Sequence, residues 1–138
     1  RVAEHSLASF KWSERANQQT SNRPSYMHCV AQTTDYLIVF VSTRRLSYEK
    51  LLDENYRGGF FTLYEDCNDA NMEFMVYKIK DKTTAELEYV STMKFDSEEK
   101  TQVWHVLNAY QIGCSLVVDV TAQTVGKRHD MVRYTLDL

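Results

Sequence analysis

The segment 36–42 constrains the fold most, because its residues read YLIVFVS and leave no polar face. A short run that is apolar on both sides is typical of a strand buried on both faces of a sheet. A second β-like run, 26–30, precedes it, and the residues between them, 32–35, are polar. We therefore expect an antiparallel hairpin whose second strand is central in its sheet.

The composition favours β structure over a helical bundle. Nine Tyr, six Phe and two Trp stand against one Pro and four Gly, and aromatic side chains suit a pleated, half-buried surface. The chain is 43% hydrophobic and 25% charged, as expected of an ordinary globular protein. Its 138 residues suffice for one domain, or for two small barrels that share a strand.

The charge of the chain gives no general attraction for a polyanion. The net charge is −3 and the pI is near 5.8, so contact with nucleic acid would need a local basic patch. The basic clusters are all flanked by Asp or Glu, and they lie at 44–45, 78–82 and 127–128.

Three cysteines, Cys29, Cys67 and Cys114, are odd in number and lack metal-ligand spacing, which favours a reduced, intracellular compartment. No stretch approaches the ~18 apolar residues of a membrane span, and no signal-peptide pattern opens the chain. Because the first residue is Arg1, we expect a segment of a longer polypeptide.

The order of elements suggests a barrel preceded by a helix. Residues 1–25 form an N-terminal extension whose loose apolar spacing favours a short helix. Ser47 as N-cap and the glycines 58–59 bound one compact helix over 47–56. Beyond it we expect short strands that curve into a small barrel, and then two closing strands; their ranges are 60–65, 73–80, 85–92, 110–120 and 131–138.

Four local patterns resemble those of extended Tudor domains, in which a Tudor barrel is inserted into a staphylococcal-nuclease-like barrel of the OB type. They read GFFTLYED (59–66), EFMVYKI (73–79), LEYVSTMK (87–94) and AYQIGCSL (109–116). The resemblance covers roughly 26–138 and implies an α+β, mainly β fold. A Tudor barrel would span about 58–110, and a linker helix would join it to a nuclease-like part formed by 26–57 and 110–138. Segments 26–42 and 110–138 would then share a sheet.

In that family, methylated arginine is boxed by about four aromatic rings and held by an Asn or Asp. Carried over by motif, Tyr64 and Tyr89 keep two of the walls. Met75 stands at the third wall, or Phe74 if the strand register differs by one. The resemblance therefore implies only a partial cage.

The remaining cage positions are altered. Thr92 replaces a Tyr, Lys94 falls where the polar Asn is expected, and Tyr77 is a neighbour. Each cation–π contact contributes roughly 0.5 to 2 kcal/mol, so losing two rings removes much of the selectivity. A lysine ~4 to 6 Å from the bound cation costs on the order of 1 to 4 kcal/mol. We expect no useful affinity for methylarginine.

These considerations predict a non-catalytic adaptor that binds a partner peptide or protein without a cofactor or metal. Aromatic and Met side chains are those that protein interfaces favour. By resemblance, the partner is another factor of a germline small-RNA (piRNA-type) pathway, and the localisation is cytoplasmic, in perinuclear germ granules. Membrane association is not expected.

Single-stranded RNA binding by an OB-type module is the main alternative, because such barrels stack bases on aromatic rings along a basic groove. Tyr36, Phe40 and Tyr77, beside Lys78 and Lys80, supply the residue types for one. A small-molecule carrier on another β-barrel is a third interpretation, which would need an apolar interior.

Catalysis has little support in the sequence. A nuclease needs clustered carboxylates and arginines, yet the available residues have no spacing that specifies a site; they are Asp35, Arg44, Arg45, Glu49, Asp53 and Asp119. His28 and Cys29 are adjacent on a strand and should point to opposite faces. The four histidines are scattered and lack zinc-ligand spacing.

Overall fold

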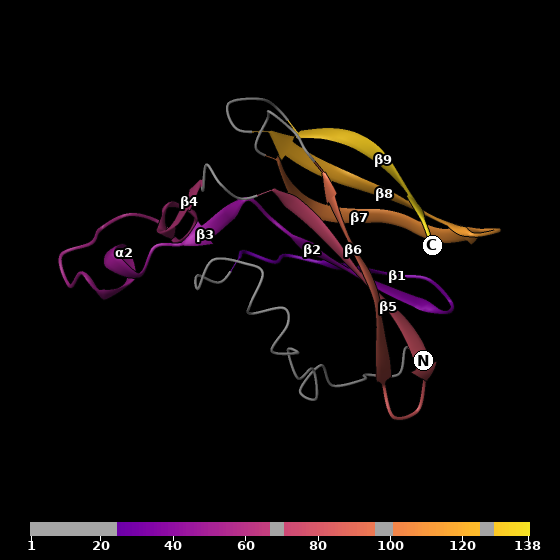
Figure 1. Cartoon of the computed structure of the whole chain (residues 1–138). Helices are drawn as coiled ribbons and strands as arrows, with labels where there is room; N and C mark the ends of the chain where they lie inside the picture. The colour runs from indigo at the N-terminus through magenta and orange to yellow at the C-terminus, as the bar shows by residue number, and fades with distance from the viewer. Residues whose placement is uncertain (1–24, 67–70, 96–100, 125–128) are drawn as a thin grey trace.

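The computed structural model describes residues 25–66, 71–95, 101–124 and 129–138, and these are mainly β structure, as expected (Figure 1). The described strands are β1 (Val30–Gln32), β2 (Tyr36–Val41), β3 (Arg44–Leu46), β4 (Tyr64–Asp66), β5 (Met72–Asp81), β6 (Glu86–Phe95), β7 (Thr101–Ile112), β8 (Ser115–Thr124) and β9 (His129–Asp137). Two short helical segments, α2 (Tyr48–Leu52) and the 3₁₀ turn η2 (Phe60–Leu63), lie between β3 and β4. The predicted extension 1–25 lies outside the described residues except for Ser25.

The described strands form three antiparallel sheets, in the orders β1-β2-β5-β6, β3-β4 and β7-β8-β9. The predicted antiparallel pairing is confirmed, since β1 pairs with β2, with Val30 opposite Val39. The first strand, however, is Val30–Gln32 and not the predicted 26–30. The turn of the hairpin is closed by Thr33, whose Oγ1 accepts hydrogen bonds from the backbone N–H groups of Asp35 (3.3 Å) and Tyr36 (3.0 Å). A threonine that satisfies turn amides in this way fixes the register of the hairpin.

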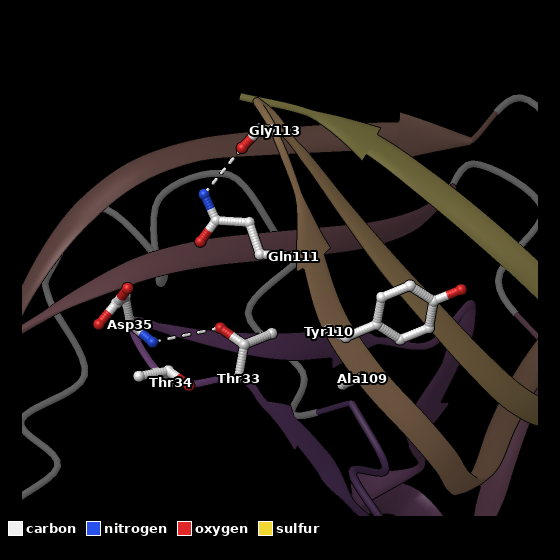
Figure 2. Close-up of a pocket in the computed structure, with 7 residues that line it drawn as sticks. All are labelled: Thr33, Thr34, Asp35, Ala109, Tyr110, Gln111 and Gly113. Carbon is white, nitrogen blue, oxygen red and sulfur yellow. Dashed lines mark hydrogen bonds between the residues drawn. The ribbon is translucent and has the colours of Figure 1, made fainter.

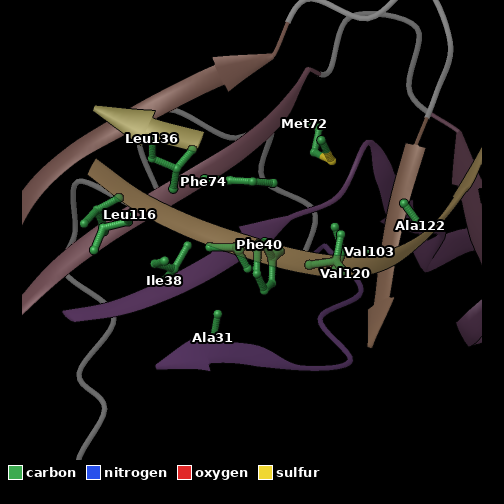
Figure 3. Close-up of a cluster of buried hydrophobic side chains, with 12 residues drawn as sticks. Ala31, Ile38, Phe40, Met72, Phe74, Val103, Leu116, Val120, Ala122 and Leu136 are labelled. Atoms are coloured by element: carbon green, nitrogen blue, oxygen red, sulfur yellow. The ribbon is translucent and has the colours of Figure 1, made fainter. Parts of the chain in front are cut away.

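The two larger sheets enclose the main core between them (Figure 3). Phe74 on β5 is fully buried at its centre. Its ring lies 4.9 Å from Phe40, 4.6 Å from Phe95 and 4.8 Å from Tyr134, measured between ring centroids. Tyr134 belongs to β9, so this cluster of rings joins the two sheets. Tilted and edge-to-face ring pairs of this kind add about 0.5 to 1.5 kcal/mol each beyond burial alone.

The second strand of the hairpin is buried on both faces, as its sequence predicts. Ile38 and Phe40 face the main core, whereas Leu37 and Val39 join a second buried cluster on the other face. β2 lies between β1 and β5. Its central position follows from the absence of a polar face.

The expectation that 26–42 and 110–138 share a sheet is wrong. β2 pairs with β5, whereas β8 pairs with β7 and β9 in a separate sheet. The physical reason lies at Gly113, whose φ of 57° is in the left-handed region and reverses the chain. The predicted single strand 110–120 is therefore the end of β7, a two-residue turn and β8. Pairing across such a short loop costs far less entropy than pairing with a distant strand.

The helix predicted over 47–56 is only five residues long and buries none of its side chains. Ser47 makes no side-chain cap, and Asp53 Oδ1 accepts a hydrogen bond from Asn55 N (2.9 Å). A side chain that bonds its neighbouring backbone offers an alternative to helix and ends it. Among the described residues, no helix is long and apolar enough to cross a membrane.

The strand predicted over 60–65 is helical in its first part, and the short β4 that follows pairs with β3 rather than with β5. In turn, β5 pairs with β2 and β6. The pairings of the described residues therefore do not close a barrel within 58–110. Residues 44–66 instead form a small excursion that leaves and rejoins the larger sheets (Figure 1).

Removing the ring of Phe74 from the centre of the core is expected to destabilise the folded protein. Phe74→Ala should lower the free energy of unfolding by about 3 to 5 kcal/mol, because it removes a buried ring and leaves a cavity between the sheets. Met131→Ala, at a side chain that is 82% exposed, should change it by less than about 0.5 kcal/mol. Chemical denaturation measures both. A cost below about 1 kcal/mol for Phe74→Ala would contradict this account of the core.

The phenol of Tyr134 makes folding sensitive to alkaline pH. Burial raises the pKa of Tyr134 above its ordinary value. The unfolded chain therefore loses this proton at a lower pH than the folded protein does, near pH ~10. The contribution of Tyr134 to the free energy of unfolding is fully present below that pH, and it is lost as the pH rises towards the pKa of the folded protein. Urea titrations between pH 9 and 11 should show a decline that is shallower in Tyr134→Phe. If the free energy of unfolding declined equally with pH in both proteins, Tyr134 would not be the group responsible.

Candidate functional site

The structure brings together only part of the predicted cage. Tyr77 and Tyr89 are opposite one another on β5 and β6, with ring centroids 5.8 Å apart. Tyr89 Oη lies 3.0 Å from Thr92 Oγ1, and Met75 is opposite Thr92 in the strand register. Met75 and Tyr77 are buried, and burial, followed by the neighbouring Tyr89, raises the pKa of Tyr77. This cluster leaves Tyr89 as its main exposed ring.

The other predicted cage residues lie elsewhere. Phe74 points into the main core, because successive residues of a strand face opposite sides of the sheet. Tyr64 is on β4, in a different sheet. The ammonium group of Lys94 lies 3.5 Å from the carboxylate of Glu73. The cage predicted by motif is therefore not assembled by the described residues.

Tyr64 instead belongs to a group of rings that sequence reasoning missed, here called the aromatic patch: Tyr26, Phe60, Phe61, Tyr64 and Trp104. Tyr26 lies at its centre, with ring centroids 5.0 Å from Tyr64, 5.8 Å from Phe60 and from Trp104, and 6.1 Å from Phe61. Burial, followed by the neighbouring Tyr26, raises the pKa of Tyr64. The patch draws on three segments that are distant in sequence.

Hydrogen bonds hold the 44–66 excursion together and tie it to Ser25, just before the hairpin. Within the excursion, Arg44 Nη2 donates to the carbonyl oxygen of Tyr64 (2.8 Å). Ser25 forms an isolated bridge with Arg45, and its hydroxyl accepts from Ser42 N (2.9 Å). Arg45 is itself buried and donates from Nη1 to the carbonyl oxygen of Ser42. Because residue 25 is held in this way, Tyr26 is placed beside Tyr64.

A β-bulge places Trp104 in the patch. The register between β7 and β8 passes from Val103 opposite Ala122 to His105 opposite Thr121, so Trp104 is the extra residue. A bulge disrupts the strict alternation of faces and redirects a side chain. Trp104 Nε1 donates to Gln123 Oε1 (3.1 Å), which holds the indole while its ring contacts Tyr26.

Three of the four histidines gather around this tryptophan. His28 lies 5.6 Å from Trp104 and 5.0 Å from His105, and His129 lies 5.8 Å from Trp104, all between ring centroids. Tyr26 Oη is 2.9 Å from His28 Nδ1. Their scatter in sequence concealed this arrangement, because His28 precedes β1 whereas the other two are on β7 and β9.

Two of the five residues of the patch are exposed, and the other three, Tyr26, Tyr64 and Trp104, are partly buried. Phe60 is 56% exposed and Phe61 is 51% exposed. Helix α2, on the same excursion, carries three more exposed apolar side chains, which are Tyr48, Leu51 and Leu52. Contiguous exposed apolar surface is typical of a site where another molecule docks. The repeated large apolar residues Phe60-Phe61 after Gly58-Gly59 were the one sequence signal that could have indicated it.

The patch does not form an open cage for a cation. Its rings contact one another edge to face, with centroids 5.0 to 6.1 Å apart. A guanidinium held between two ring faces needs about 7 to 8 Å between them, since each contact requires about 3.5 to 4.0 Å. The rings therefore present an apolar surface and not a cation-sized gap.

A separate open pocket of about 500 Å³ lies between the β1–β2 turn and the end of β7 (Figure 2). Its polar groups are mostly committed to the protein itself. Thr33 Oγ1 closes the turn, and Gln111 Nε2 donates to the carbonyl oxygen of Gly113 (2.9 Å). Asp35 lies 3.9 Å from Lys82 Nζ. Nothing in this lining pairs a nucleophile with a base.

The residues considered for catalysis lie on different elements. Asp119 on β8 accepts a two-point contact from Arg133 (2.6 and 3.0 Å), which lowers the pKa of that carboxyl, whereas Glu49 and Asp53 lie at α2. Cys29 packs against the core while His28 is exposed, as their adjacent positions predict. Burial raises the pKa of the Cys29 thiol. In the described part of the chain, no three His, Cys, Asp or Glu side chains are grouped to hold a metal ion.

No protein-family model and no curated protein matches this sequence. The function must therefore be inferred from the residues themselves, and the aromatic patch is the candidate site.

Proposed function

We propose that this chain is a non-catalytic protein-interaction module that binds an apolar segment of a partner protein through the aromatic patch. The observation that carries the proposal is the exposure of Phe60 and Phe61, each more than half open to solvent, beside three further rings. Burying such rings under a partner removes apolar area from water at roughly 25 cal/mol per Å². Aromatic side chains are also the residues most enriched at interface hot spots.

The patch is arranged before any partner arrives. Each ring contacts at least one other ring edge to face, and Tyr26 contacts four of them. Rings that are already held in place lose little side-chain entropy on binding. Preorganisation of this kind is typical of a site that binds a specific partner, in contrast to an exposed apolar surface that binds proteins non-specifically.

The charges around the patch favour a protein over RNA. Exposed rings can stack bases, which is the observation that supports the RNA alternative. However, Arg44 Nε is 3.4 Å from Asp66 Oδ1, and Lys50 Nζ is 2.9 Å from Glu65 Oε1. Cations that already face carboxylates contribute little to phosphate binding, from which nucleic-acid affinity largely derives.

The basic groove predicted for RNA is not formed either. Phe40 and Tyr77 belong to buried clusters on opposite faces of their sheet. Lys80 is paired with Glu88 at 2.6 Å. The protein-binding proposal is therefore the better supported of the two.

An adaptor role is also what the resemblance to extended Tudor domains implies. The nested barrels of that family are not what the described strand pairings form, so the motifs alone support the resemblance. A partner from a germline small-RNA pathway and a cytoplasmic localisation, in perinuclear germ granules, remain predictions that depend on it.

Removing the two exposed phenylalanines should impair binding without unfolding the domain. Peptides selected from a displayed library on the whole chain supply the ligand, and fluorescence anisotropy measures its Kd. Phe60→Ala with Phe61→Ala should weaken binding by about 30-fold or more, the equivalent of about 2 kcal/mol. The matched control replaces two exposed apolar side chains on β6 and β7, Val90→Ala with Ile112→Ala, and should leave Kd within about twofold.

Two outcomes would contradict this proposal. One is an equal loss of peptide affinity in both double variants while their circular dichroism spectra are unchanged, which would show that the peptide does not bind specifically at the patch. The other is that no peptide is selected while a single-stranded RNA oligonucleotide binds with an affinity that falls steeply with salt, as phosphate contacts require.

Arginine methylation should make no difference to binding. The closely packed rings leave no space for a guanidinium between their faces. Matched arginine-containing peptides, plain and symmetrically dimethylated, should therefore bind within about twofold of each other in isothermal titration calorimetry. A preference of about tenfold or more for the methylated peptide would show that a cage forms.

A further inference from the structure

Two histidine side chains meet where the segment just before β1 lies beside β7. His28, just before β1, and His105, on β7, have ring centroids 5.0 Å apart and planes inclined at 80°. Both residues are exposed. β1 and β7 are neighbours that belong to different sheets, so this pair bridges two sheets without a shared ladder of hydrogen bonds.

The bulge at Trp104 is what allows this meeting. With regular alternation, Trp104 and His105 would point to opposite faces of β7. Because Trp104 is the extra residue in the β7–β8 register, both rings contact His28, at 5.6 and 5.0 Å. Bulges are over-represented at sites where a side chain must be redirected for a function.

We infer that His28 and His105 bind one divalent transition-metal ion of the Zn²⁺, Ni²⁺ or Cu²⁺ class. Imidazole suits these metals, and a tetrahedral ion with N ligands at about 2.0 to 2.1 Å holds two imidazole centres about 5 Å apart. The observed separation of 5.0 Å matches that spacing. The exposed ring of His105 can rotate about χ2 to direct a nitrogen at the ion.

Tyr26 supplies the outer contact that histidine ligands commonly have. Its hydroxyl oxygen lies 2.9 Å from His28 Nδ1. In the tautomer in which Nδ1–H donates to that oxygen, the lone pair of Nε2 is available to a metal. Such outer partners orient the ring and raise its basicity, and their loss typically costs 10- to 100-fold in metal affinity.

Two protein ligands define an exchangeable site and not a buried structural one. The described residues place no third His, Cys, Asp or Glu in a metal-binding group here, so water completes the coordination. An ion at this position links the segment just before β1 to β7. Because it binds only the folded arrangement, it stabilises the contact between the two sheets.

The test titrates ZnCl₂ and, separately, NiCl₂ into the whole chain. Calorimetry should give one site, and metal at about 100 times its Kd should raise Tm by roughly 5 to 10 °C. His28→Gln and His105→Gln should each weaken binding by about tenfold or more. Tyr26→Phe keeps the ring but removes the hydroxyl, and should also weaken it.

His129→Gln is the matched control. Its ring contacts Trp104, but among the described ring contacts it meets neither His28 nor His105, so affinity and the Tm shift should be unchanged. Unaltered binding in the His28→Gln, His105→Gln double variant would overturn the assignment. So would loss of binding in Cys114→Ser, since a thiol would then be the ligand. The assay needs no partner protein, so its outcome is independent of the proposed docking function.

Discussion

The contact of Phe74 with rings from both larger sheets is the interaction on which the structure depends. Phe40 and Phe95 belong to the same sheet as Phe74, whereas Tyr134 belongs to the other. Two sheets that share no ladder of hydrogen bonds are held by the side chains between them, so packing sets how one lies on the other. The packing of this core therefore sets the geometry of every site formed by residues from both sides of it, including the approach of His28 to β7.

The same principle explains why the candidate site is exposed. The 44–66 excursion is too small to enclose a core, and its helix buries no side chain. Its phenylalanines make edge-to-face contacts with one another and with Tyr26, Tyr64 and Trp104, and these contacts leave about half of each residue exposed to water. An apolar surface that its own chain can only half cover is suited to a second molecule.

Parts of the fold could be predicted because they follow from local chemistry. The hairpin of β1 and β2 follows from an unbroken apolar run after a polar turn. The reversal at Gly113 is equally local, but a glycine within a β-like run is also compatible with the continuous strand predicted over 110–120. The predicted cage is assembled only in part, for a different reason. Tyr64 lies on β4, which pairs with β3 and not with β5, and the motif places Phe74 or Met75 at one wall without specifying which side of the strand the core occupies.

The sequence by itself determined that the chain is mainly β, that β2 is central, and that the net charge of −3 gives no general attraction for a polyanion. These properties depend on alternation, turn chemistry and composition, which the sequence carries directly. Only the tertiary structure decided which sheets face each other and which rings gather. The aromatic patch unites Tyr26, the 60–64 segment and Trp104, and the histidine pair unites residues from segments of different sheets. Such contacts between distant segments are selected by the packing of the whole core, which no local pattern encodes.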